Sequence, residues 1–166
     1  IRLEMGSALP SAFTVETWIR PDRWGEYDWG FGRIFDKEAF VLFLNGYNHT
    51  NYNDESLVAF CDFAGGVGAA FNTAPGTIRL GEWQHIAVTF DEARRPQLEF
   101  FLNGQPLGAT SPAENQPPAA GTPLVTNSGV PARIGDSSSG LRGLAAGFAS
   151  LRIWNGVRSQ SQILTS

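Results

Sequence analysis

Two loops that mix aromatic and polar residues carry the side chains of this sequence that could recognise a ligand. The first spans residues 22–33 and the second spans residues 45–55. Sugars need such a mixture, because their C–H faces pack on aromatic rings while their hydroxyl groups bond to polar side chains. The sequence therefore predicts a carbohydrate site in these loops. The candidate ligand-binding residues are Trp24, Tyr27, Trp29, Tyr47, His49 and Tyr52.

A structural role is the alternative for these rings. Tryptophan is usually largely buried, so about half of the loop aromatics are expected to close the open ends of the fold. Trp18, Trp83 and Trp154 belong to runs in which side chains alternate as in strands. We expect these three rings in the core rather than on a ligand surface.

Asn53 and Asp54 are the first candidates for a metal site. They precede a strand-like run and supply amide and carboxylate oxygens, which are the hard ligands that Ca²⁺ prefers. The alternative is that both residues only turn the chain and cap the strand. The sequence leaves both possibilities open.

The acidic residues give little support for catalysis. A retaining glycosidase needs two carboxyl groups about 5 Å apart, and strand residues two positions apart share a face. The pairs with this spacing are Glu26 with Asp28 and Asp36 with Glu38, and glycines on both sides of the first pair favour a loop. The sequence also contains no G-x-S-x-G motif and no zinc-ligand spacing. We therefore predict that the protein is not an enzyme.

Composition limits the class of protein and its partners. The chain has 166 residues, 42% of them hydrophobic, and a formal net charge of −4. This length predicts one domain over residues 1–166, which we expect to be part of a longer chain. Its longest basic cluster is Arg94-Arg95, so nucleic acid and anionic membranes are poor partners. No apolar run approaches the ~20 residues of a membrane-spanning helix, and the single cysteine, Cys61, is expected in the interior.

The stretch over residues 81–104 organises the predicted fold. Side chains alternate between apolar and polar over residues 83–90 and again over residues 98–102, which is typical of two strands of a hairpin. Asn103-Gly104 then supplies the left-handed positions of a type I′ turn. We expect a third strand through Pro106 and Leu107 to fold back on the second.

The rest of the chain also favours strands. Prolines concentrate in residues 105–133, which predicts a surface loop with one or two short edge strands. Ser159 and Gln162 have the spacing of a capping box, so one short terminal helix is expected. About a dozen short strands and one helix predict an all-β domain of two packed layers. The further strand-like runs are residues 13–20, 34–35, 40–44, 57–63, 69–71, 133–136 and 148–154.

Five of these segments resemble laminin G-like domains in the same order. Residues 13–19 (FTVETWI) resemble the FTVEAWV opening, and residues 83–90 (WQHIAVTF) resemble the WHHVAVTYD strand. Residues 102–104 resemble the turn of that family, 133–136 its LRIGD strand, and 151–163 its final strand and helix. The resemblance covers nearly the whole chain. It implies the concanavalin A-like jelly-roll sandwich of two curved antiparallel sheets, the superfamily that includes the pentraxins.

The resemblance also suggests a function. Members of the family include carbohydrate-binding modules, adhesion domains and glycosidases. It implies a non-catalytic carbohydrate-binding or adhesion module of a secreted or cell-surface protein, beside other domains of the parent chain. A structural or protein-binding spacer is the alternative, and a glycoside hydrolase is the third possibility. The segment at Asn53 and Asp54 resembles a pentraxin calcium segment, which implies Asp136 as a further ligand, although Ala149 stands where many relatives carry an Asp.

Overall fold

The alternating runs form strands in a computed structural model of the chain. The structure describes residues 2–3, 8–26, 30–37, 39–112, 115–125, 129–137 and 139–166. In chain order the elements are β1 (Arg2–Leu3), β2 (Ala12–Pro21), β3 (Gly30–Asp36), β4 (Phe40–Asn45), β5 (Ser56–Phe63), β6 (Val67–Asn72), β7 (Gln84–Asp91), β8 (Leu98–Leu102), β9 (Gln105–Leu107), β10 (Ala132–Ile134), β11 (Ala146–Asn155) and α1 (Gln160–Leu164).

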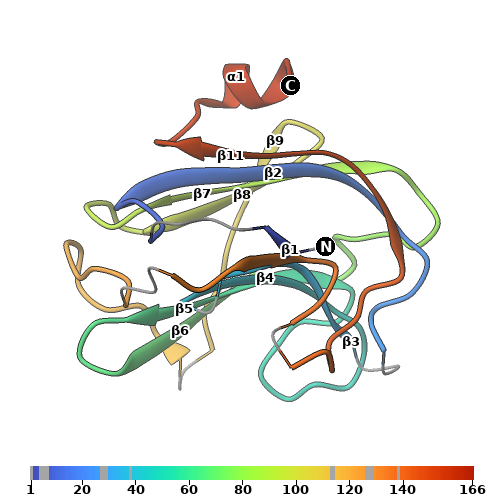
Figure 1. Ribbon diagram of the computed structural model, residues 1–166, viewed down its shortest axis with the longest axis horizontal. Helices are drawn as coiled ribbons and strands as arrows, with labels where there is room; N and C mark the ends of the chain where they lie inside the picture. The colour runs from blue at the N-terminus through green and yellow to red at the C-terminus, as the bar shows by residue number, and fades with distance from the viewer. Residues whose placement is uncertain are drawn as a thin grey trace.

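These strands make two antiparallel sheets. One sheet has six strands in the order β1-β10-β3-β4-β5-β6, and the other has five in the order β11-β2-β7-β8-β9. The two layers bow in the same sense, and the five-stranded sheet arches over the six-stranded one (Figure 1). The outer face of the six-stranded sheet is therefore the concave side of the molecule. The predicted all-β sandwich with one short C-terminal helix is confirmed.

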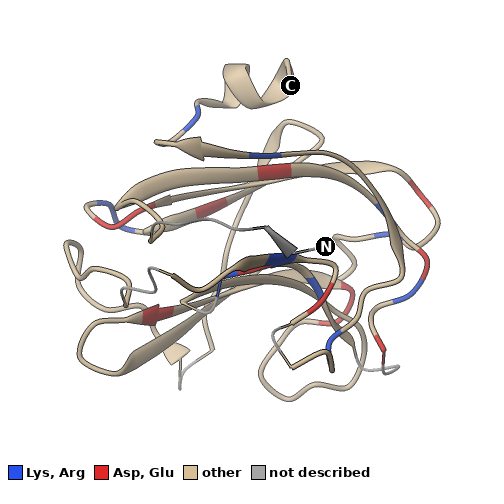
Figure 2. Ribbon diagram, in the orientation of Figure 1, with Lys and Arg blue, Asp and Glu red and all other residues tan. Residues whose placement is uncertain are grey.

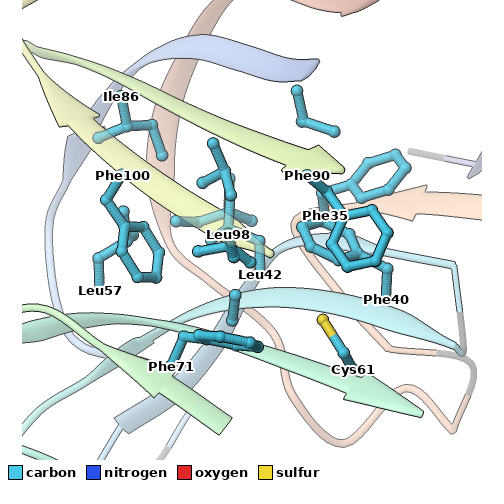
Figure 3. Packing of buried hydrophobic residues seen from close by; sticks show 14 of the residues in the cluster. Phe35, Phe40, Leu42, Leu57, Cys61, Phe71, Ile86, Phe90, Leu98 and Phe100 are labelled. Carbon is cyan, nitrogen blue, oxygen red and sulfur yellow. The ribbon is translucent and has the colours of Figure 1, made fainter. Parts of the chain in front are cut away.

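The core lies between the two sheets. Phe90 of β7 points toward Phe35 and Phe40 of the opposite sheet, and Phe100 of β8 points toward Leu57 (Figure 3). These side chains occupy alternate positions of their strands, because successive residues of a strand point to opposite faces. Aromatic rings contact one another within the core. The ring of Phe13 stacks on that of Phe90 with a centroid distance of 5.1 Å and meets the ring of Phe40 edge to face at 5.0 Å. Cys61 is buried in the same cluster, as expected, and burial raises the pKa of its thiol.

The meander of β7, β8 and β9 confirms the expectation for residues 81–107. Asn103 and Gly104 have φ angles of 50° and 76°, the left-handed values that a type I′ turn requires. In the proline-rich region, the described residues form only short pairings, as predicted. They are β9, isolated bridges from Asn72 to Thr110 and from Phe63 to Leu124, and β10.

The expectation that residues 22–33 form one loop is wrong at its end. Strand β3 begins at Gly30 and pairs with β4, with register shifts on both sides of Gly32. The glycines that suggested a loop mark a close approach of two backbone segments instead: a Cβ at Gly32 would lie 2.6 Å from the carbonyl oxygen of Trp24. Glycine in a strand often has this role.

The expectation that three tryptophans lie in the core is also wrong. Trp18, Trp83 and Trp154 are 36%, 48% and 40% exposed. On β2 the odd-numbered residues face the core, so Trp18 points outward, where it contacts His85 of β7 at a ring distance of 5.3 Å. The alternation of side chains along β2 was predicted correctly. Large apolar residues, however, occupy both its inward-facing and its outward-facing positions.

Helix α1 packs on the outer face of the five-stranded sheet. The capping box of Ser159 and Gln162 is present, as predicted. Ile163 is buried against Ala87 and Phe101. None of the helices that the structure describes is long and apolar enough to cross a membrane. Figure 2 shows acidic and basic residues interspersed along the ribbon rather than gathered on one basic face.

Candidate ligand-binding site

The outer face of the six-stranded sheet carries an apolar cluster. Strands β4 and β5 are apolar on both faces, and in a sandwich of two layers no third layer covers their outer face. The cluster consists of Val41, Phe43 and Val58, with Phe60 packed against them. Apolar residues gathered on the outside of a sheet need either a cover or a ligand.

Two arginines and two further rings, those of Phe31 and Tyr52, surround this cluster and form a pocket. The guanidinium carbon of Arg33 lies 4.8 Å from the ring centroid of Phe43, and that of Arg142 lies 4.7 Å from the ring centroid of Phe31. The cavity has a volume of about 240 Å³. We call it the aromatic-arginine pocket; it is lined by Phe31, Arg33, Val41, Phe43, Tyr52, Phe60 and Arg142.

Phe31 owes its position to the irregular start of β3. Its φ angle is 63°, an uncommon value for a residue with a side chain. The register shift between Gly30 and Gly32 places this conformation in a bulge. As a result the Phe31 ring meets Phe43 at 5.4 Å and Tyr52 at 5.9 Å.

Two predicted ligand residues lie together beside this pocket. The rings of His49 and Tyr52 stack with a centroid distance of 4.6 Å and an interplanar angle of 13°. His49 also meets the Phe31 ring at 4.9 Å, and its Nδ1 atom accepts a hydrogen bond from the backbone N–H of Asn51. Burial, followed by the charge of Arg142, lowers the pKa of His49. The neutral imidazole is therefore favoured near pH 7.

The other described candidates lie on the opposite side of the loop. Tyr47 is exposed and donates a hydrogen bond to Oε1 of Glu55, which raises the pKa of the phenol. Both residues line a second, mainly polar cavity of about 310 Å³. Trp24 also lines it but is only 6% exposed and belongs to the core, so its ring offers no open face for stacking. Tyr27 and Trp29 lie outside the described residues and stay predicted ligand residues.

Asn53 and Asp54 make hydrogen bonds with other parts of the chain. The amide nitrogen of Asn53 donates to the Thr73 carbonyl at 2.7 Å, and Oδ1 of Asp54 accepts from the Asn48 N–H at 3.0 Å. In the segment after β10, Oδ1 of Asp136 accepts hydrogen bonds from the N–H groups of Ser137 and Arg142. Among the described residues, no three His, Cys, Asp or Glu side chains are grouped so that they could hold a metal. Calcium binding by Asn53, Asp54 and Asp136 stays a prediction.

A larger cavity, of about 450 Å³, lies beside β7 and β8 on the other sheet. Its charged lining includes both signs, and within it Arg94 pairs with Asp91 at 3.1 Å. None of its described lining residues is aromatic. Because binding sites combine apolar surface with a few placed polar groups, the smaller aromatic-arginine pocket is the better candidate.

Sequence reasoning did not single out most of this pocket. Phe31, Arg33, Phe43, Phe60 and Arg142 were not predicted as ligand residues. A signal was present in residues 40–44, which are apolar at every position although only one face of a strand can meet the core of a two-layer sandwich. Nothing in the sequence, however, places Arg142 beside Phe31.

Comparisons with known proteins support the architecture. A family model described as the concanavalin A-like lectin/glucanases superfamily matches residues 1–164. No curated protein sequence matches the chain significantly. Among solved structures, a SAP-like pentraxin from Limulus polyphemus superimposes with a TM-score of 0.60 at 16% identity, covering 99% of this chain and 73% of the pentraxin.

Two further solved structures are similar. Domain 4 of the extracellular arabinanase AbnA from Geobacillus stearothermophilus, solved in complex with arabinotriose, has a TM-score of 0.60 at 18% identity, covering 99% of this chain and 70% of that one. The binding domain of Paraclostridial Mosquitocidal Protein 1 has a TM-score of 0.58 at 16% identity, covering 99% of this chain and 38% of that one. At such identities these likenesses show the fold alone.

Proposed function

The chain belongs to the concanavalin A-like lectin/glucanases superfamily, and from this premise we propose that it is a non-catalytic carbohydrate-binding module. The observation that carries the proposal is the aromatic-arginine pocket on the concave face of the six-stranded sheet. Its aromatic rings suit the C–H surface of a sugar ring, and its guanidinium groups suit the polar substituents. The arabinotriose complex of the similar AbnA domain supports sugar recognition by this fold.

Binding without bond cleavage fits the pocket better than hydrolysis does. Glycosidases commonly use two carboxyl groups that flank the scissile bond. The described residues that line the aromatic-arginine pocket include neither Asp nor Glu. Of the acidic pairs considered in the sequence, Asp36 pairs with Arg33, while Asp28 and Glu38 lie outside the described residues.

We propose a secreted or cell-surface setting, with other domains of the parent chain as neighbours. The support comes from the similar structures, which include a domain of an extracellular enzyme and the binding domain of a mosquitocidal protein. We also retain calcium at Asn53, Asp54 and Asp136 as a proposal. Sugar recognition in the aromatic-arginine pocket does not depend on it.

A protein-binding role is the second candidate, and one observation favours it. Trp18, Trp83 and Trp154 expose their rings on or beside the outer face of the five-stranded sheet. Exposed tryptophans are enriched where proteins meet. A similar structure, the binding domain of Botulinum neurotoxin DC, was solved in complex with rat synaptotagmin II.

A glycan array followed by calorimetry on the best glycan separates the two candidates. The substitution Tyr52→Ala removes a ring from the aromatic-arginine pocket and is expected to weaken sugar binding by about three- to tenfold, a loss typical for one stacking contact. The matched control Trp83→Ala removes a ring from the opposite sheet and is expected to leave binding unchanged. Circular dichroism confirms that each variant is folded.

Two results would contradict the proposal. Loss of glycan binding in Trp83→Ala but not in Tyr52→Ala would move the site to the five-stranded sheet. Absence of binding to any glycan on the array would favour the protein-binding candidate instead.

A further inference from the structure

The charge of the aromatic-arginine pocket is opposite to that of the chain. The chain has a formal net charge of −4. The two charged residues among the described lining of this pocket, Arg33 and Arg142, are both cationic. Two guanidinium groups beside one small cavity are unfavourable unless an anion or a carboxylate lies near them.

We propose that the ligand of this pocket is an acidic saccharide, whose carboxylate or sulfate group is bound by Arg33 and Arg142. This inference rests on the proposed carbohydrate-binding function and specifies its ligand class. Both anions have oxygen atoms spaced to accept the paired N–H groups of a guanidinium.

The aromatic rings hold both guanidinium groups in place for such a contact. Arg33 lies over Phe43 and Arg142 lies over Phe31, with distances of 4.8 and 4.7 Å from the guanidinium carbon to the ring centroid. Stacking uses the face of a guanidinium and leaves the N–H donors in its plane for hydrogen bonds. A group fixed in this way loses little conformational entropy on binding.

Asp36 balances part of the positive charge of Arg33. Arg33 is an ion-pair partner of Asp36, with 3.5 Å between Nε and Oδ2, but its buried Nε atom makes no hydrogen bond among the described residues. Burial lowers the pKa of the Arg33 guanidinium, Asp36 raises it, and the neighbouring charge of Arg142 lowers it. The two arginines therefore repel each other, and an anion between them would relieve this repulsion.

The size of the pocket suits one sugar unit. Its volume of about 240 Å³ lies just below the range of roughly 300–1,000 Å³ for drug-sized ligands. The anionic group of one residue could contact the arginines while its ring packs against Tyr52 and Phe60. Tyr52 lines the pocket, and its ring stacks on that of His49.

Matched ligands test the inference without altering the fold. Titration calorimetry on the wild-type chain, at low salt, compares galacturonic acid oligomers with their carboxyl-reduced forms and carrageenan oligosaccharides, which carry sulfate but no carboxylate, with their desulfated forms. We expect at least one acidic ligand to bind about tenfold or more tightly than its neutral partner, the loss typical for a charged hydrogen bond. The carboxylate and sulfate pairs distinguish the two anionic groups.

Matched variants assign the effect to the pocket. Arg142→Gln and Arg33→Gln are expected to abolish the preference for the acidic ligand. Arg20→Gln is the control, because Arg20 also lies near an aromatic ring, that of Trp83 at 5.7 Å, but beside the opposite sheet. It should retain the full preference.

The outcomes separate this inference from the function on which it rests. Equal or better binding of the neutral partners would overturn the acidic ligand and leave carbohydrate binding intact. If Arg20→Gln lost the preference while both pocket variants kept it, the acidic group would be bound outside the aromatic-arginine pocket, and the inference would be overturned. If neither member of any pair binds and the glycan array is also negative, both proposals fail.

Discussion

Arg158 donates a hydrogen bond from its Nη1 atom to Oε1 of Glu16 at a distance of 2.7 Å, and this contact joins the segment before α1 to the middle of β2. The Glu16 side chain is fully buried, and its Oε1 atom also accepts from Nε1 of Trp154 at 2.9 Å. A buried carboxylate needs such partners, because an unpaired charge in the interior is strongly destabilising.

Removing Arg158 is therefore expected to destabilise the fold. We predict that Arg158→Met lowers the free energy of unfolding by about 3 kcal/mol, the typical loss when one member of a buried pair is removed. Urea denaturation followed by tryptophan fluorescence measures it. The control is Arg152→Gln, since Arg152 lies 3.6 Å from the same Oε1 atom but is 41% exposed, against 16% for Arg158. We expect the control to lose less than about 1 kcal/mol, and equal losses in the two variants would contradict the prediction.

The positions of these strands and turns along the chain could be predicted because local chemistry determines them. The alternation over residues 83–90 and 98–102, and the turn at Asn103-Gly104, depend on neighbours in sequence, and all were found. The capping box at Ser159 depends on a residue only three positions away. Such signals are available without knowledge of the tertiary fold.

The candidate site was harder to predict from the sequence, because it depends on which face of a strand meets the core. Phe40 and Leu42 face inward while Val41 and Phe43 face outward, although all four are apolar. The same ambiguity led to the wrong prediction for Trp18. The bulge at Phe31 and the approach of Arg142 to it arise from contacts between distant segments, which periodicity does not reveal.

Stability is expected to fall as the pH is lowered below neutrality, through His85. Burial lowers the pKa of His85, Glu16 raises it, and the charges of Arg152 and Arg158 lower it further. The folded state thus binds a proton less readily than the unfolded chain, whose histidine has an ordinary pKa of 6.5. Stability present above this value is lost as the pH falls below it, by at most about 1.4 kcal/mol for each pH unit.

Thermal unfolding of the wild type and of His85→Gln between pH 7.5 and 5.5 measures this effect. The chain contains two histidines, and the pKa of the other, His49, is also lowered by burial, so some pH dependence is expected to remain in the variant. We expect a smaller decrease in Tm for the variant than for the wild type. The same decrease in both proteins would rule out His85 as the source.

Chelation tests the calcium proposal. If Asn53 and Asp54 bind calcium, the ion stabilises the native state, by about 2.7 kcal/mol at a concentration 100-fold above its Kd. Calorimetry is then expected to show a higher Tm in calcium than in EDTA for the wild type, and no such difference for Asp54→Ala. A Tm that chelation does not change would leave both residues with only the hydrogen bonds seen in the structure, from Asn53 to Thr73 and from Asn48 to Asp54.

Gly32 is expected to be intolerant of any side chain, because β3 passes close to the loop before it. A Cβ at this position would lie 2.6 Å from both the carbonyl oxygen of Trp24 and Cδ1 of Leu144, and the backbone oxygen cannot move aside as a flexible side chain can. We predict that Gly32→Ala lowers the free energy of unfolding by about 2 kcal/mol, as overpacking of a core does. Gly108→Ala is the control, since a Cβ there has no neighbour within 4 Å.

The same substitution links the fold to the candidate site. Gly32 lies between Phe31 and Arg33, which both line the aromatic-arginine pocket, so displacement of this strand would move a ring and a charge together. Gly32→Ala is therefore also expected to weaken glycan binding under conditions where the variant is still folded, whereas Gly108→Ala is not. A destabilised Gly32→Ala variant with unchanged glycan affinity would show that ligand recognition does not require the bulged start of β3.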